Sequence, residues 1–159
     1  MVFVHKLVQA TSFLIFSSAV ALASPSIRGV RLYQAEKDVI KLLGTPTIRN
    51  KEHHLMIYKR HDGSRLFVKL GEKRNVIDVQ AVLDSHGKFL KSDWVTLKLD
   101  DSTIHYGDKR EFVESILGPS NSILPGPDYS FRRAYWKHKV AVDYVDDKVV
   151  KVTLASENI

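Results

Sequence analysis

Two short stretches of the sequence carry apolar residues at helical spacing. The first stripe consists of Leu32, Ala35, Val39, Leu42 and Leu43. The second stripe consists of Phe112, Val113, Ile116 and Leu117. Gly44 and Gly118 follow where a helix closes through a left-handed residue, and a proline within two residues prevents continuation. Asp108 and Glu111 have the spacing of a capping box, so the pattern predicts two short helices with abrupt ends.

Strand-like alternation of apolar and polar residues follows each helix. After the first helix, the candidate strands are residues 55–58, 65–70 and 76–83. After the second, they are residues 132–136, 140–145 and 149–154. Turn signals separate neighbouring candidates, among them Asp62-Gly63 and Asp146-Asp147. Residues 94–99 add a strand or extended bridge between the two groups.

The two groups of elements are copies of one pattern. Residues 30–46 and 104–120 superpose without a gap at an offset of 74 residues. We therefore predict an α+β fold of two tandem repeats, each a short N-terminal helical element packed on a three- to four-stranded antiparallel sheet. The first repeat would cover residues 24–83 and the second residues 103–159, with residues 84–102 connecting them.

The first 23 residues have the pattern of a secretory signal. A short, weakly basic start precedes an uncharged apolar stretch that ends in Ala21-Leu22-Ala23, with small residues where a signal peptidase requires them. An uncleaved membrane anchor is less favoured, because the stretch barely reaches the ~20 apolar residues needed to span a membrane. We expect cleavage after Ala23 and a periplasmic or secreted protein.

Composition removes several classes of function. None of the 159 residues is cysteine, which excludes disulfide scaffolds, thiol catalysis, zinc fingers and a lipid anchor on cysteine. The net charge of +6 is spread along the chain, so it predicts attraction to acidic surfaces in general. No nucleic-acid-binding motif accompanies the charge, and we expect no nucleic-acid partner.

The candidate catalytic and metal-binding residues have simpler explanations. His53, His54 and His61 could bind zinc or copper, but adjacent residues of a strand point to opposite faces, so surface histidines are favoured. The carboxylate pairs Asp100-Asp101 and Asp146-Asp147 lie in predicted turns. There is no Gly-x-Ser-x-Gly elbow and no phosphate loop. We expect no enzymatic activity, no metal and no cofactor.

Residues 125–136 form the most unusual stretch of the chain. A proline-rich turn leads into a predicted strand that combines aromatic side chains with arginine, the residue types enriched at binding hot spots. The predicted partner-binding residues are Tyr129, Phe131, Arg132, Arg133, Tyr135 and Trp136. The alternative, that these aromatic side chains belong to the core, stays open at this point.

The second copy carries a family resemblance. The motif Ile104-His105-Tyr106-Gly107, followed by Val113 and then Leu117-Gly118-Pro119, resembles the SmpA/OmlA (BamE) family of envelope proteins. Two such units in one chain look like the tandem architecture of the beta-lactamase inhibitory proteins. Tyr33 stands where the family usually has glycine, and the lipid-attachment cysteine and the inhibitors' disulfides are missing.

The resemblance implies a non-catalytic role through protein–protein contact. The partner would be another exported or outer-membrane protein, and the chain would act as an envelope accessory factor or as an inhibitor. The alternative hypothesis is a binding protein for an anionic envelope polymer or a small ligand. Polyanion binding should weaken steeply with salt, whereas an aromatic-centred protein interface should weaken less.

Overall fold

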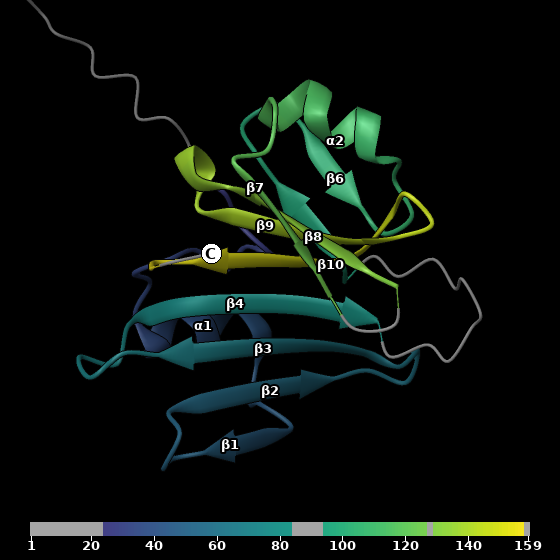
Figure 1. Cartoon of the computed structure of the whole chain (residues 1–159). Coiled ribbons are helices and arrows are strands. Elements are labelled where there is room, and N and C mark those ends of the chain that lie inside the picture. The colour runs from purple at the N-terminus through teal and green to yellow at the C-terminus, as the bar shows by residue number, and fades with distance from the viewer. Residues whose placement is uncertain (1–23, 84–93, 127–128, 158–159) are drawn as a thin grey trace, which may run out of the picture.

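The structure is a computed structural model that describes residues 24–83, 94–126 and 129–157 (Figure 1). The predicted signal peptide, residues 84–93 of the predicted connection and residues 127–128 lie outside these ranges. The helices are α1 (Glu36–Leu43), α2 (Arg110–Leu117) and the single 3₁₀ turn η1 (Trp136–His138). No helix within the described ranges is long and apolar enough to cross a membrane.

Ten strands account for most of the secondary structure in the described residues. They are β1 (Ile48–Asn50), β2 (Leu55–Lys59), β3 (Ser64–Leu70), β4 (Val76–Leu83), β5 (Thr96–Lys98), β6 (Thr103–His105), β7 (Ser122–Pro125), β8 (Phe131–Tyr135), β9 (Val140–Val145) and β10 (Lys148–Ala155). Eight of them form one antiparallel sheet in the order β1-β2-β3-β4-β10-β9-β8-β7, while β5 and β6 pair with each other.

This sheet corrects the predicted fold class. Strands β4 and β10 were expected in two separate sheets, but they pair with each other from Lys151↔Val82 to Ala155↔Asp78. The prediction of two helix-plus-sheet repeats is therefore wrong, and the fold is a sheet-dominated one with two short helices. The physical reason is that alternation identifies a strand without fixing its neighbour. Unpaired strand edges leave backbone groups without partners, and pairing β4 with β10 satisfies them.

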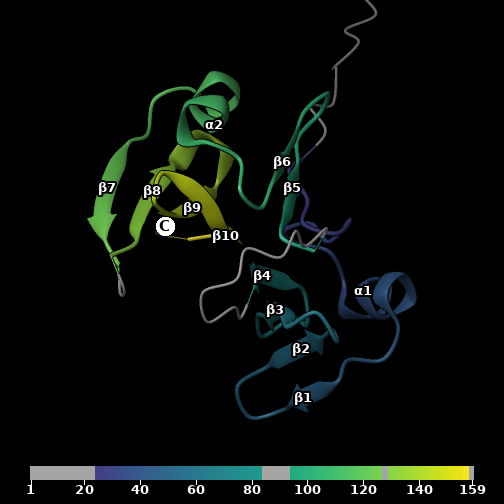
Figure 2. The same cartoon turned by 90° about the vertical axis from the view of Figure 1, so that its right-hand side faces the viewer.

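In strands β2 to β4, one face of the sheet carries the core. Along β3 the buried residues alternate with half-buried ones, so every second side chain faces the helices. Helix α1 adds Val39 to this core, α2 adds Val113 and Leu117, and the β5–β6 pair adds Leu97 and Ile104. Figure 2 shows α1, α2 and the β5–β6 pair around the sheet. On the opposite face, side chains of β2 to β4 are half-buried or exposed, and neither α1 nor α2 packs on them (Figure 2).

The helix ends confirm one prediction and correct another. Gly44 (φ 82°, ψ −167°) and Gly118 (φ 79°, ψ −172°) terminate the two helices at the predicted positions and at positive φ, although not in the αL conformation. The predicted capping box is absent, because Lys109 is the N-cap of α2 and makes no side-chain cap. Asp108 instead accepts a 2.7 Å hydrogen bond from the backbone N–H of His105. This bond uses the carboxylate that would have capped the helix.

The strand predictions hold best where strands are long. The predicted strands 55–58, 65–70, 76–83 and 140–145 match β2, β3, β4 and β9 to within one residue. The predicted strand 132–136 instead ends at Tyr135, and Trp136 starts η1. Strands β1, β6 and β7 were not predicted. With three or four residues each, they are too short to show an alternating pattern.

Candidate interaction surface

The structure divides the six predicted contact residues into exposed and buried groups. Three aromatic side chains are exposed: Tyr129 (95%), Trp136 (58%) and Phe131 (55%). The fourth, Tyr135, is buried at 1% exposure. The two arginines are half-buried and lie on opposite faces of β8, because neighbouring residues of a strand alternate. Only part of the predicted set therefore lies on a surface that a partner can reach.

Tyr135 lies in the core beneath helix α2. Its hydroxyl group lies 3.1 Å from the hydroxyl of Tyr144 on the neighbouring strand β9. Burial raises the pKa of both phenols, so both stay protonated over the physiological pH range. The two buried hydroxyls form a hydrogen bond with each other, so Tyr135 has a structural role in the core.

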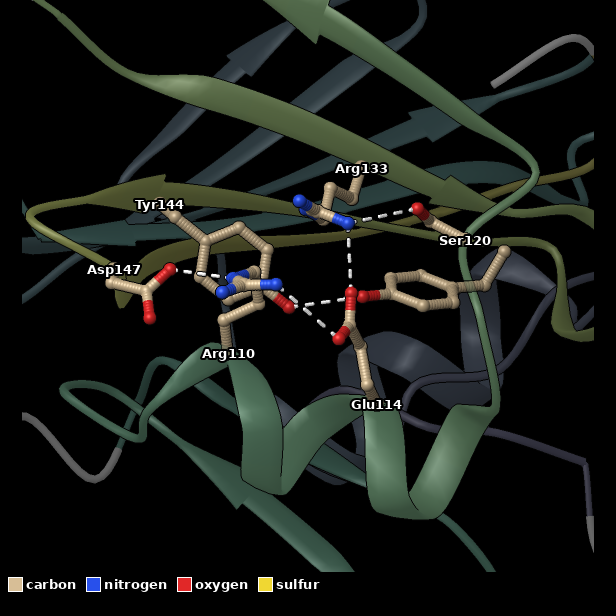
Figure 3. A network of polar contacts seen from close by, with 7 residues as sticks. Arg110, Glu114, Ser120, Arg133, Tyr144 and Asp147 are labelled. Atoms are coloured by element: carbon tan, nitrogen blue, oxygen red, sulfur yellow. Dashed lines mark hydrogen bonds and ion pairs between the residues drawn. The ribbon is translucent and has the colours of Figure 1, made fainter.

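Arg133 connects the sheet to helix α2. Its Nη1 donates hydrogen bonds to Glu114 Oε1 at 2.8 Å and to Ser120 Oγ at 3.2 Å. Glu114 also pairs with Arg110 at 3.4 Å, and Arg110 Nε donates to Asp147 Oδ1 at 2.6 Å (Figure 3). Arg133 is thus one member of a polar chain that holds α2 on strands β8 and β9.

Arg132 points to the opposite face of the sheet. Its Nε and Nη2 donate to the two carboxylate oxygens of Asp143 at 2.7 and 2.9 Å, and these bonds raise the pKa of the guanidinium group. Lys151 lies 3.8 Å from the same carboxylate, and burial lowers the pKa of its ammonium group. Together with Leu124, these residues line a hollow of about 500 Å³. Arg132 is therefore committed to an internal ion pair.

Strand β7 supplies contact candidates that the sequence did not predict. It is the last strand of the sheet, and no strand of the described residues pairs with its outer edge (Figure 2). Ile123 and Leu124 of β7 are about half exposed. The only signal for them was two adjacent apolar residues between Asn121-Ser122 and Pro125. Four residues of this kind do not predict a strand by themselves.

The exposed apolar side chains gather around this edge. Six of the nine large hydrophobic residues exposed in the described part of the chain lie between Phe112 and Trp136. Ile123 is opposite Arg133 in the register and shares the helix side with Phe131, whereas Leu124 is opposite Arg132 on the other side. We define the edge surface as Ile123, Leu124, Tyr129 and Phe131. It wraps around β7 and presents apolar groups on both sides of the strand.

The three candidate metal ligands do not converge on one site. His53 and His54 precede β2, whereas His61 follows it, so the strand separates them. Across its five residues this distance is about 15 Å, too long for one metal site. In the part of the chain that the structure describes, no group of three or more His, Cys, Asp or Glu residues could hold a metal ion.

Comparison with known proteins shows the fold but no family. No family model and no curated protein matches the sequence. Two solved structures are similar at a TM-score of 0.51 and 0.50. The first is the DUF4309 family protein YjgB from Bacillus subtilis, 14% identical, with 82% of this chain and 84% of that chain covered.

The second similar structure is an extracellular protein containing an SCP domain from Bacillus anthracis. It is 11% identical, and the match covers 98% of this chain but 50% of that protein. The chain thus spans about half the length of this neighbour. Neither structure is a SmpA/OmlA protein or a beta-lactamase inhibitory protein, and at these identities both show similarity of fold alone.

Proposed function

We propose that this chain is an exported, non-catalytic interaction module that binds another exported or outer-membrane protein through the edge surface. The observation that carries the proposal is the concentration of exposed apolar side chains around β7. A monomeric soluble protein rarely exposes such a cluster unless a partner covers it. Burying one large apolar side chain contributes roughly 1.5–3 kcal/mol, so four of them can centre a stable interface.

The edge surface is also held in place before binding. Four register pairs fix β7 on β8, and five fix β8 on β9. The polar chain from Arg133 to Asp147 fixes α2 against these strands. A partner therefore loses little binding free energy to ordering this surface.

The alternative, a binding protein for an anionic polymer, has less support. Arg132 is paired with Asp143 and Arg133 with Glu114, so both strand arginines already have carboxylate partners. A polyanion would have to compete with these carboxylates. We therefore expect partner binding that depends little on salt, as for an apolar interface.

Export is part of the proposal. The signal pattern of residues 1–23 supports cleavage after Ala23, and one of the two similar structures is an extracellular protein. The resemblance to SmpA/OmlA proteins and beta-lactamase inhibitory proteins supports an envelope accessory factor or an inhibitor. Expression with the complete N-terminus, followed by N-terminal sequencing of exported protein, should give Ser24 as the first residue. Protein retained in the cell with Met1 in place would contradict export.

The binding proposal is tested with matched variants. The immobilised protein is compared with the double variant Tyr129→Ser and Phe131→Ser and with a control, Leu42→Ser and Ile48→Ser. The control residues are similarly exposed but lie on α1 and β1. The native protein and the control should retain one stoichiometric exported protein, and the edge variant should lose roughly tenfold or more in affinity. Equal capture by all three, with unchanged denaturation midpoints, would refute the edge surface.

A further inference from the structure

A second feature lies away from the edge surface, in a cleft of about 630 Å³. Segments far apart in the sequence form its walls, namely the first described residues, the turn before α1, the β5–β6 turn, α2, η1 and β10. The volume is within the range of about 300–1,000 Å³ that is usual for small-molecule sites. None of the predicted contact residues lines this cleft.

The cleft has an apolar floor and a charged rim. Leu32, Leu99, Ile116 and Leu154 supply the floor. The rim carries carboxylates from one element and ammonium groups from another: Asp100 and Asp101 from the β5–β6 turn, Lys137 from η1 and Lys139 just after it. Within the described residues, Asp100, Asp101 and Lys137 form no ion pair. Their charges are therefore available to a ligand.

Tyr33, on the wall of this cleft, has a strained backbone. It adopts a left-handed conformation (φ 66°), which is unfavourable for an aromatic residue. At the matching position before α2 the chain has Gly107 (φ 83°), and both residues donate a 2.8 Å backbone hydrogen bond to the sheet. The backbone geometry therefore suits glycine. The residue at this position is nevertheless a tyrosine, and because it is 56% exposed, burial contributes little to offset the strain.

Lys139 fixes the exposed ring over the cleft. Its Nζ donates a 2.8 Å hydrogen bond to the Tyr33 hydroxyl and lies 5.1 Å from the ring centroid. Lys139 is itself left-handed (φ 54°). Tyr33 and Lys139 both have positive φ, and their side chains contact each other on the rim of the cleft. Backbone strain clusters at binding sites, so this pair supports a binding role for the cleft.

From these observations we propose that the cleft binds a small zwitterion with an apolar body, of the class of apolar amino acids and short apolar peptides. The ligand's ammonium group would lie beside Asp100 and Asp101, and its carboxylate beside Lys137 and Lys139. The apolar body would cover the leucine floor and contact the Tyr33 ring. Binding requires both charges and the apolar body of the ligand, because the aspartates, the lysines and the apolar floor each contact a different part of it.

The test uses the dipeptide leucyl-leucine in isothermal titration calorimetry. Forms acetylated at the amino end or amidated at the carboxyl end each remove one charge. We expect saturable binding of the free dipeptide and binding weaker by roughly tenfold for each blocked form. No heat of binding at dipeptide concentrations up to about 10 mM would overturn the proposal, and so would equal binding of all three forms.

Tyr33→Gly separates a binding role from a structural one. Glycine adopts the same backbone without strain, so the urea denaturation midpoint should stay close to that of the native protein while affinity falls roughly tenfold. Tyr129→Gly is the matched control, since Tyr129 is also an exposed, left-handed tyrosine (φ 59°) but lies outside the cleft. Unchanged affinity in Tyr33→Gly, or an equal loss in the control, would refute the assignment.

Discussion

The segment that enters α1 and the segment that enters α2 are joined to the sheet by the same backbone hydrogen bonds. The N–H of Glu36 donates to the carbonyl of Arg74 at 3.0 Å, and the N–H of Arg110 donates to the carbonyl of Asp147 at 3.0 Å. Both acceptors lie in the turn between two neighbouring strands, β3–β4 in one case and β9–β10 in the other. The two helices are thus anchored in equivalent ways.

The side chains at these anchor points have opposite polarity. At α1 the helix supplies the carboxylate, and Glu36 accepts hydrogen bonds of 2.8 and 2.9 Å from Arg74 of the turn. At α2 the helix supplies the guanidinium, and Arg110 donates to Asp147 of the turn. The backbone therefore determines where the ion pair forms. The acidic residue lies in the helix at α1 and in the turn at α2.

The two outer edges of the sheet differ more than the anchors do. β1 has one exposed large apolar residue, Ile48, followed by polar Arg49 and Asn50. β7 has two adjacent ones and continues into the exposed Tyr129 and Phe131. Polar and charged residues protect an edge strand from pairing with other chains, so β1 is the protected edge and β7 the edge suited to a partner.

The largest expected effect comes from reversing the charge of Glu36, which joins α1 to the β3–β4 turn. Glu36→Arg places a third guanidinium group beside Arg49 and Arg74, which both pair with Glu36. We expect the free energy of unfolding in urea to fall by about 2–3 kcal/mol, because hydrogen bonds to a charged, half-buried group are lost. Adding Arg74→Asp recreates the α2 polarity and should restore at least half of the loss.

The control for this prediction is Lys37→Glu, a charge reversal at an exposed neighbouring position. It should change the free energy of unfolding by less than about 0.5 kcal/mol. If Glu36→Arg with Arg74→Asp is no more stable than Glu36→Arg alone, the α1 anchor does not tolerate the charge arrangement found at α2.

A smaller effect is expected from exchanging the residues before the helices. No atom lies within 4 Å of a Cβ placed on Gly107, so Gly107→Ala adds backbone strain without a steric clash. It should lower the free energy of unfolding by about 1 kcal/mol. Tyr33→Gly should stay within about 0.5 kcal/mol of the native protein, since relief of strain offsets the added freedom of the unfolded chain. Equal losses in both variants would show that the two backbones are not equivalent.

The smallest expected effect concerns Asp78, where the two halves of the sheet meet. Burial raises the pKa of its carboxyl group above the ordinary 3.8, outweighing a hydrogen bond from Gln80 and the charges of Lys151 and Lys69. The native state therefore holds this proton more tightly than the unfolded state. The resulting stabilisation is complete below pH 3.8 and is lost as the pH rises through the native pKa.

Asp78→Asn removes this dependence. Relative to the native protein, the variant should gain free energy of unfolding between pH 4 and pH 7, by less than about 1 kcal/mol. Urea denaturation at several pH values measures the difference. A difference that is constant or shrinks as the pH rises would contradict the direction of the shift.

Sequence reasoning worked where the signal was local. Gly44 and Gly118 fixed the helix ends, because a glycine at positive φ followed by proline leaves no alternative within a few positions. The long strands were found because seven or eight alternating residues make a distinct pattern. The capping-box prediction is wrong because the Asp108 carboxylate accepts a hydrogen bond from the His105 N–H and does not cap α2. The sequence pattern does not show which of these two local hydrogen bonds is the more stable.

The candidate site was predicted only in part, since exposure depends on what packs above a strand. Aromatic and arginine content identified residues 129–136, but only the fold buries Tyr135 against Tyr144 while leaving Phe131 exposed. Ile123 and Leu124 are contact candidates because β7 is the last strand of the sheet, a position that the sequence does not reveal.

By itself, the sequence determined the positions of the two helices and of the long strands. These features depend on residues a few positions apart or on a pattern that repeats along the chain. Only the tertiary structure decided that β4 pairs with β10, that eight strands form one sheet, and that Tyr33 and Lys139 meet over a cleft. Such contacts join residues separated by tens of positions. The alternating pattern of a strand fits many possible neighbours and does not determine which strand pairs with it. The pairing is decided by the arrangement that forms the most backbone hydrogen bonds and buries the most apolar surface.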